Sequence, residues 1–376
     1  MEANGYSTWL EIDLGAIRNN VRQLLDMTQT RVMAVVKADG YGHGALAVAK
    51  AATEAGATWC GVARLDEALA LRHAGINSRI LVMGYTPPDR IPDAIANNVS
   101  LTVYDFDVAH AYADLAEAQG LDVRVHAKVD TGMGRLGLKV EDAVEFLRVF
   151  HARPGVEVEG FFTHFARADE PQSSNMTLTQ LQRFDELLET IDALGLRPRY
   201  VHAANSSGTI AYPQARYDLV RPGIALLGLD PSPEVMLPDS FKIALTWKAK
   251  LSSVKTLPPH HGISYGHTYY TQDWEKIGVV PVGYADGFRR VPGNMVLVEG
   301  KRVPVVGNVC MDQLMVRLDA IPEAKIGSEV VLLGQQKDKI ISGHEIAHRW
   351  GTITYEVICG LATRLHREYI NSSETS

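Results

Sequence analysis

Eight short apolar runs alternate with helix-like stretches between residues 30 and 230, and this alternation constrains the fold more than any other feature. Strands that alternate with helices at such spacings form parallel sheets, and eight strand-helix units close a barrel. The sequence therefore predicts an α/β fold with a (β/α)8 barrel. The runs lie at residues 32–37, 59–63, 80–84, 101–104, 123–129, 158–164, 200–205 and 218–223.

The texture of the chain changes after about residue 240. From there on, β-rich runs are separated by Gly, Pro and Asn turns, with a short helix-like stretch at 342–351. We therefore expect residues 1–235 to form the barrel domain and residues 236–376 to form a mostly β domain. The N-terminal segment is a candidate to pack with the β domain instead of the barrel.

Composition and charge exclude several classes of protein. Hydrophobic residues make up 46% and charged residues 22%, which is typical of a globular chain. A net charge of -7 without any basic run argues against a nucleic-acid or membrane surface. The chain has no secretory signal pattern and no apolar window of transmembrane length. Its three cysteines are few and far apart, which indicates reduced thiols in a cytoplasmic protein.

Polar residues collect at the ends of the expected strands, where barrel enzymes carry out their chemistry. The loops after the seventh and eighth strands, at 205–208 and 222–224, are small enough for a phosphate to approach the backbone closely. The strand-end residues are Lys37, Lys128, Asp130, His164, Asn205, Ser206 and Arg221.

Lys37 at a strand end suggests Schiff-base chemistry. Burial disfavours the ammonium form and exposes a nucleophilic amine. From periodicity alone, a solvated strand-end lysine is an equal alternative. Composition also does not separate a pyridoxal-phosphate lysine from the lysine of a class I aldolase.

The stretch 123–137 ends in G-x-G-x-x-G, formed by Gly132, Gly134 and Gly137. Such a motif between a strand and a helix is found in dinucleotide-binding turns. Here it follows the fifth strand, and the helix starts after the motif instead of inside it, which argues against NAD.

Nine segments of the chain resemble alanine racemases, and they occur in family order over nearly the whole length. They lie at 34–44, 126–137, 163–169, 202–208, 221–228, 264–269, 282–288, 307–313 and 354–360. The resemblance implies a racemase that uses pyridoxal 5′-phosphate to interconvert L-alanine and D-alanine.

The resemblance also assigns two bases. Lys37 would carry the cofactor and handle the α-proton on the D side, and Tyr265 would act on the L side. A neutral tyrosine needs help to act as a base, which His164 and Arg221 would supply through a relay. Arg221 would face the pyridine nitrogen and keep it unprotonated.

The remaining roles follow the same resemblance. Lys128 and Arg135 would both lie near the cofactor ring, and carbamylation of Lys128 would turn their repulsion into attraction. The glycines would let the chain turn so that Arg135 points inward. The phosphate would be held by Tyr41, Ser206, Gly223, Ile224 and Tyr355, with Asn205 close by. Substrate would meet Arg135, Met311 and Tyr284.

The family also implies a head-to-tail homodimer with shared active sites, in which the β domain covers the partner's barrel. The product would serve peptidoglycan synthesis, or D-alanine catabolism would use the reaction. Alternatives are a racemase of another small amino acid such as serine, a fold-related decarboxylase, and a non-enzymatic cofactor carrier. The carrier is disfavoured because related carriers have no β domain.

Two positions depart from the family pattern, and one motif points elsewhere. Leu227 stands where an aromatic residue is common, and Asn308 where arginine is common. The segment 344–348 matches the H-E-x-x-H pattern of zinc proteases, but its helix is short and we expect no metal.

Overall fold

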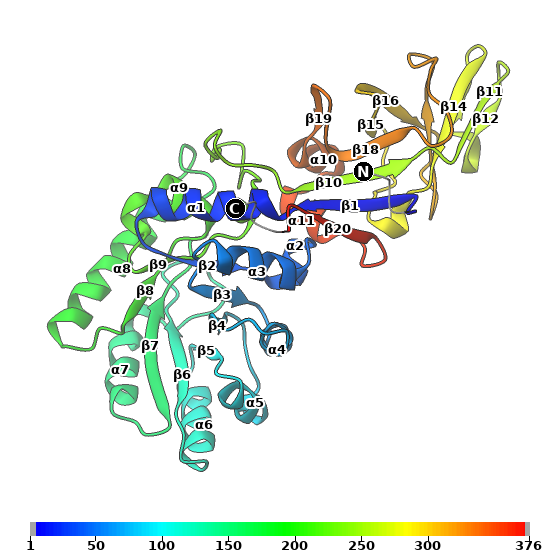
Figure 1. The fold of residues 1–376 in the computed structure, drawn as a ribbon. Coiled ribbons are helices and arrows are strands. Elements are labelled where there is room, and N and C mark those ends of the chain that lie inside the picture. Colours follow the sequence, from blue (N-terminus) through cyan, green and yellow to red (C-terminus); the bar gives the residue numbers. More distant parts are fainter. Residues whose placement is uncertain (1–4, 373–376) are drawn as a thin grey trace. The chain divides into compact units, whose positions relative to one another are not determined.

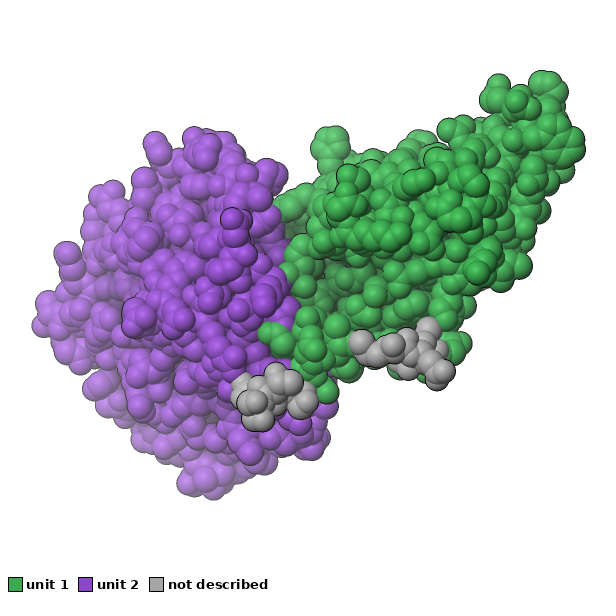
Figure 2. All heavy atoms as spheres, turned by 45° about the horizontal axis from the view of Figure 1, so that its top comes forward, with its two compact units in different colours: residues 1–15, 41–44, 243–376 green, residues 16–40, 45–242 purple. Residues whose placement is uncertain are grey.

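A computed structural model describes residues 5–372 and divides the chain into two compact units. We call residues 16–40 and 45–242 the barrel unit, and residues 41–44 with the two terminal segments up to Gly15 and from Ile243 the β unit (Figure 2). A loop of four residues, Tyr41–Gly44, thus belongs to the β unit although barrel residues flank it in sequence.

The barrel unit contains eight parallel strands that pair in the order β9-β2-β3-β4-β5-β6-β7-β8 (Figure 1). Two backbone bonds link the residues that flank β9 to β8 and the residues just after it: Asp218 N–H to Val201 O at 3.0 Å and Arg221 N–H to Ala204 O at 2.9 Å. All eight expected runs form strands, so the prediction of a (β/α)8 barrel is confirmed. The strands are β2 (Arg31–Val35), β3 (Trp59–Val62), β4 (Arg79–Val82), β5 (Ser100–Val103), β6 (Val123–Lys128), β7 (Val156–Phe162), β8 (Tyr200–His202) and β9 (Leu219–Val220).

Amphipathic helices separate the strands in sequence. In the longest of them, the apolar positions Leu181, Phe184, Leu188 and Ile191 are buried, and Phe184 stacks on Phe161 of β7. Gly195, just beyond its end, has a φ of 68°, the left-handed conformation expected there. The helices are α1 (Leu14–Thr28), α2 (Lys37–Tyr41), α3 (Ala45–Glu54), α4 (Leu65–His73), α5 (Ile91–Ala96), α6 (Phe106–Glu117), α7 (Val140–His151), α8 (Met176–Ala193) and α9 (Ser206–Ala211).

The β unit is built on a ten-stranded sheet in the order β11-β14-β17-β16-β15-β18-β10-β1-β20, with β19 paired to β18. The N-terminal strand β1 lies in this sheet, antiparallel to β10 and parallel to β20. In β10 buried and half-buried residues alternate, as expected for a sheet with one covered face.

The sheet strands are β1 (Thr8–Asp13), β10 (Leu245–Lys250), β11 (Ser253–Leu257), β14 (Glu275–Val280), β15 (Met295–Val298), β16 (Lys301–Val306), β17 (Leu314–Arg317), β18 (Glu329–Gln336), β19 (Lys339–Ile341) and β20 (His366–Ile370). A hairpin of β12 (Gly262–Ile263) and β13 (Tyr269–Tyr270) and the helices α10 (Gly343–Trp350) and α11 (Thr354–Cys359) complete the unit. The mostly β character expected of the C-terminal part is confirmed.

Candidate active site

Four cations act electrostatically on one imidazole, His164, which follows a strand of the barrel. Burial and then the charges of Arg221, Arg135, Lys128 and Lys37 lower the pKa of His164 well below its usual value. His164 is therefore neutral at physiological pH. Because so many positive charges converge on one end of the barrel, this end is suited to bind an anionic ligand.

Arg221, directly after β9, is the most firmly held of these cations. It is 3% exposed, and burial lowers its pKa to about 9, which still leaves it charged at neutral pH. Its guanidinium donates to two carbonyl oxygens and two imidazoles: Thr163 O at 2.9 Å, Ala203 O at 2.8 Å, His202 Nδ1 at 2.8 Å and His164 Nδ1 at 3.2 Å. With this many bonds the guanidinium is fixed in one orientation.

A buried polar chain continues from Arg221 into the barrel interior. His202 Nε2 lies 2.8 Å from His126 Nδ1, and His126 Nε2 lies 3.5 Å from Glu159 Oε1. Since Arg221 donates to His202 Nδ1, His202 carries its proton on Nε2 and donates it to His126 Nδ1, which leaves the His126 proton on Nε2, the nitrogen that faces Glu159. Burial lowers the pKa of both histidines, so both are neutral.

Glu159 ends this chain as a buried carboxylate. It is 4% exposed and is bound by Ser100 and Arg79. Although burial raises its pKa, its contacts with His126, Ser100 and Arg79 outweigh that effect and lower the pKa to about 2. Glu159, His126 and His202 were not among the residues expected to be functional. The available signal was a titratable residue inside each of three apolar strand runs.

Lys128, at the end of β6, is 4% exposed, and its Nζ donates to Leu136 O at 2.9 Å. Burial and then the charges of Arg135 and Arg221 lower its pKa to about 8. The charge of Arg135 therefore contributes, after burial, to the lowered pKa of Lys128, as expected for two neighbouring cations.

The glycine-rich turn after β6 wraps around a carboxylate. Asp130 accepts backbone N–H bonds from all four residues 132–135, at 2.9, 2.7, 2.8 and 3.2 Å. Burial raises the pKa of Asp130, but these four bonds lower it below its usual value. Gly137 has a φ of 140°, and a Cβ there would lie 2.4 Å from Asp130 N. The N–H groups that a dinucleotide phosphate would need are therefore already bound.

The turn after Lys37 has an unusual backbone. Ala38, Asp39 and Gly40 have φ values of 53°, 53° and 61°, all left-handed. Each such L-residue costs about 1–2 kcal/mol, so the turn needs support. Glu67 provides it, because its carboxylate accepts from Ala38 N at 2.7 Å and also from the N–H groups of Ala63 and Arg64.

One serine ties together the two loops expected to hold a phosphate. Ser206 Oγ accepts from Gly223 N at 2.9 Å and from Ala225 N at 3.3 Å. Asn205 precedes it and caps α9, accepting from Gly208 N at 2.8 Å. Ile224 and Leu227 lie in the same short segment and are buried.

The β unit brings two tyrosines of the expected phosphate site together. The rings of Tyr41 and Tyr355 lie 6.2 Å apart. Burial and the proximity of Tyr355 raise the pKa of Tyr41, so its hydroxyl stays protonated and can donate a hydrogen bond.

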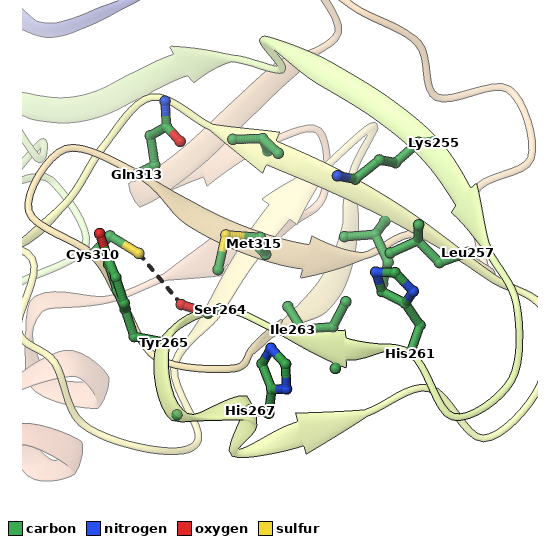
Figure 3. A pocket seen from close by; sticks show the side chains of 14 residues that line it. Lys255, Leu257, His261, Ile263, Ser264, Tyr265, His267, Cys310, Gln313 and Met315 are labelled. Carbon is green, nitrogen blue, oxygen red and sulfur yellow. Dashed lines mark hydrogen bonds between the residues drawn. The ribbon is translucent and has the colours of Figure 1, made fainter.

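The β unit also gathers Tyr265, Tyr284 and Met311 around one loop. Tyr284 N donates to Cys310 O and Ala285 N to Met311 O, each at 3.0 Å. Ser264, just before Tyr265, is bonded to Cys310 Sγ at 3.3 Å (Figure 3). The side chains are exposed, at 71% for Tyr265, 54% for Met311 and 45% for Tyr284. A hollow of about 500 Å³ lies beside Tyr265, between Ile263, His267 and Met315.

The residues of the zinc-protease pattern at 344–348 form ion pairs and a hydrogen bond with neighbouring side chains. Glu345 pairs with Arg302 at 2.7 Å and with Arg349 at 3.5 Å, and His344 Nδ1 lies 3.2 Å from Thr354 Oγ1. Within residues 5–372, no group of three or more His, Cys, Asp or Glu side chains is arranged to hold a metal.

Comparison with known proteins shows the family to which the chain belongs. The N-terminal domain of alanine racemases matches residues 12–231, and the C-terminal domain of alanine racemases matches residues 244–369. The chain belongs to the alanine racemase family. The resemblance drawn from the sequence is thereby confirmed.

Individual relatives of this family cover nearly the whole chain. Alanine racemase of Symbiobacterium thermophilum is 46% identical over 365 residues, 96% of this chain and 97% of the relative. Alanine racemase from Bacillus anthracis, solved with bound L-Ala-P, is 41% identical with a TM-score of 0.91, covering 99% of this chain and 97% of that one. Histidine racemase from Leuconostoc mesenteroides is 30% identical with a TM-score of 0.89, covering 98% and 99%.

Across the described residues 5–372, the helices are all too short or too polar to cross a lipid bilayer.

Proposed function

We propose that this chain interconverts L-alanine and D-alanine with pyridoxal 5′-phosphate bound at the carboxyl end of the barrel. The observation that carries the proposal is the hydrogen bond of Arg221 to His164 at 3.2 Å, together with the positive charges of Lys37, Lys128 and Arg135 that also act on this imidazole. A phosphorylated cofactor and an amino-acid carboxylate both bring negative charge to such a site.

The residues present fit the cofactor. When bound, it supplies an electron sink that acidifies the α-proton of an amino acid. Lys37 would attach it covalently, and the fixed guanidinium of Arg221 would donate to its ring nitrogen. The small loops tied by Ser206 would receive the phosphate. The full set for the phosphate is Tyr41, Asn205, Ser206, Gly223, Ile224 and Tyr355.

Two bases would move the proton in this proposal. Lys37 Nζ would exchange it on the D side, and the Tyr265 hydroxyl on the L side. His164 is neutral because of burial and its cationic neighbours. Because Arg221 donates to its Nδ1, the neutral ring carries its proton on Nε2 and would stabilise the deprotonated oxygen of a tyrosine by donating a hydrogen bond to it.

Lys128 is suited to carbamylation. With a pKa of about 8, roughly one amine in ten is neutral at pH 7 and able to attack CO₂. The attack forms an N–C bond and releases a proton, and the resulting anion would pair with Arg135. Intact-mass measurement in bicarbonate, compared with Lys128→Ala, tests this, since only the wild type should gain the mass of one CO₂.

The most specific part of the proposal is the size of the substrate side chain, which decides which amino acid is racemised. The fold alone does not set it, because a histidine racemase shares the architecture. Relatives at 46% and 42% identity are named for alanine, and Met311 with Tyr355 would wall a small pocket. Racemisation rates on alanine, serine, histidine and lysine should fall steeply with size, with serine as a slow secondary substrate. Equal rates on alanine and lysine would refute this assignment.

We also propose a homodimer with shared sites. Tyr265, Met311 and Tyr284 are largely exposed in one chain, although the proposal needs them beside a cofactor. Inactive Lys37→Ala and Tyr265→Ala subunits, when mixed, should regain part of the activity. No recovery from a mixture shown to contain heterodimers would exclude shared sites. The three free thiols agree with a cytoplasmic location.

A further inference from the structure

The turn that carries Tyr265 is strained on its N-terminal side. Ser264 has φ 64° and ψ -177°, a conformation that is essentially reserved for glycine. Gly266, on the other side, has φ 73°. A residue with a Cβ stays in such a conformation only where its surroundings hold it there.

Asn308 holds this turn at two points. Its backbone oxygen accepts from Ser264 Oγ at 2.6 Å, and its side-chain Nδ2 donates to Tyr265 O at 2.7 Å. The two segments touch closely, because a Cβ on Gly307 would lie 2.7 Å from Ile263 O. These two hydrogen bonds, which we call the clamp, fix the Ser264 side chain before Tyr265 and the carbonyl group of Tyr265 itself.

This clamp matters because little else positions the phenol. The Tyr265 side chain is 71% exposed, so packing within its own chain does not fix it. The place of its hydroxyl then depends on the backbone from which it projects. Figure 3 shows the side chain of Tyr265 extending from this turn, beside the Ser264–Cys310 hydrogen bond.

We infer that Asn308 is a positioning residue for the L-side proton transfer, acting through the backbone of Tyr265. The inference rests on the proposed function, in which the Tyr265 hydroxyl exchanges the α-proton on the L side. A displacement of about 1 Å at a reacting group can cost roughly 10²-fold in rate. Loss of the clamp should therefore slow L-side exchange and leave D-side exchange at Lys37 intact.

The test measures two rates on D-alanine in D₂O. Inversion requires both bases, whereas deuterium uptake with retention of configuration requires only the base on the D side. The ratio of uptake to inversion is close to its wild-type value in any variant that is merely less stable. In Asn308→Ala and Asn308→Asp, which both lose the amide donor, this ratio should rise roughly tenfold to a hundredfold.

Three further variants sharpen the result. Gln272→Ala removes an exposed amide that donates to Tyr270 O at 3.0 Å in the same hairpin region, and it should leave the ratio unchanged. Ser264→Gly relieves the strain but loses the hydroxyl bond, so the ratio should rise without a lower melting temperature. In a Tyr265→Phe background, Asn308→Ala should change inversion by less than about twofold, because the residue through which it acts is already disabled.

A wild-type ratio of uptake to inversion in Asn308→Ala would overturn the inference. It would also be overturned if Asn308→Ala slowed inversion by the same factor in the Tyr265→Phe background as in the wild type. If Tyr265→Phe itself leaves the ratio unchanged, the base assignment is wrong and the inference falls with it. A raised ratio in Tyr265→Phe with a normal ratio in Asn308→Ala rejects the clamp alone.

Discussion

The turn at Lys37 and the turn at Tyr265 both hold a strained backbone beside a proposed base, but they hold it with different hydrogen bonds. Both place a left-handed residue with a Cβ next to the proposed base: Ala38 after Lys37, and Ser264 before Tyr265. The barrel turn is braced by the Glu67 carboxylate on a backbone N–H group. The β-unit turn is braced by a neutral hydroxyl and a neutral amide. Charge-assisted bonds are about twice as strong, so the barrel turn is the stiffer one.

The barrel residues of the proposed site are also more deeply buried than the proposed base in the β unit. Arg221, Lys128 and Glu159 are each 4% exposed or less and are linked to bonded partners, whereas Tyr265 is mostly exposed. A buried network of this kind is preorganised but costly to disturb. The barrel thus contributes a half of the proposed site that rests on a buried, bonded network, and the β unit contributes a half whose geometry depends on a few neutral bonds.

The largest expected effects come from the two bases themselves. Lys37→Ala should abolish both turnover and the visible absorbance of bound cofactor, because it removes the attachment point. Tyr265→Ala should keep the absorbance and lose roughly 10²–10⁴ in rate. Absorption spectra and racemisation assays on both variants check this. Release of the cofactor from Tyr265→Ala would contradict the division into two halves.

Glu159→Gln should cause the largest loss of stability. Its pKa falls from 4.5 to about 2 on folding, which corresponds to roughly 3 kcal/mol at neutral pH. A depressed carboxylate pKa stabilises the fold above pH 4.5, and this contribution is lost as pH falls toward 2. Urea unfolding should show the difference between variant and wild type shrinking over that window. A difference that is constant with pH would assign the loss to packing instead of charge.

Glu67→Gln probes the brace on the barrel turn and should have a smaller effect. Three backbone N–H groups lose a charged acceptor, for which we expect a loss of about 1–2 kcal/mol in unfolding free energy. Cofactor affinity should fall with it, since the residue after Lys37 is held by this carboxylate. An unchanged affinity in the folded variant would show that the turn keeps its shape without Glu67.

Arg148→Ala should have the smallest effect on stability. It tests whether a charged pair contributes to stability only where it is buried. Arg148 and Glu145 form a surface ion pair on α7 with side chains that are 57% and 58% exposed. Such pairs contribute at most about 1 kcal/mol and often nothing measurable. A melting temperature far below that of the wild type would weaken the contrast drawn between buried and exposed networks.

Some of the candidate site was predictable from sequence because barrel topology places the ends of parallel strands at one edge. That rule alone brought Lys37, Lys128, His164 and Arg221 into one list, and the charges of the two lysines and of Arg221 all act on His164. It did not reveal the chain through His202 and His126 to Glu159, since these contacts join three different strands. Nor did it show that Asn308 bonds the backbone of Tyr265, 43 residues away in sequence.

The sequence by itself determined the strand-helix alternation, the change to a β-rich C-terminal part and the family. These depend on periodicity and on local motifs, which a linear chain displays directly. Only the tertiary structure decided that Asp130 occupies the N–H groups of the glycine-rich turn and that His202 and His126 lie between Arg221 and Glu159. The physical reason is that hydrogen-bond partners and burial depend on distances between segments that lie far apart in the chain.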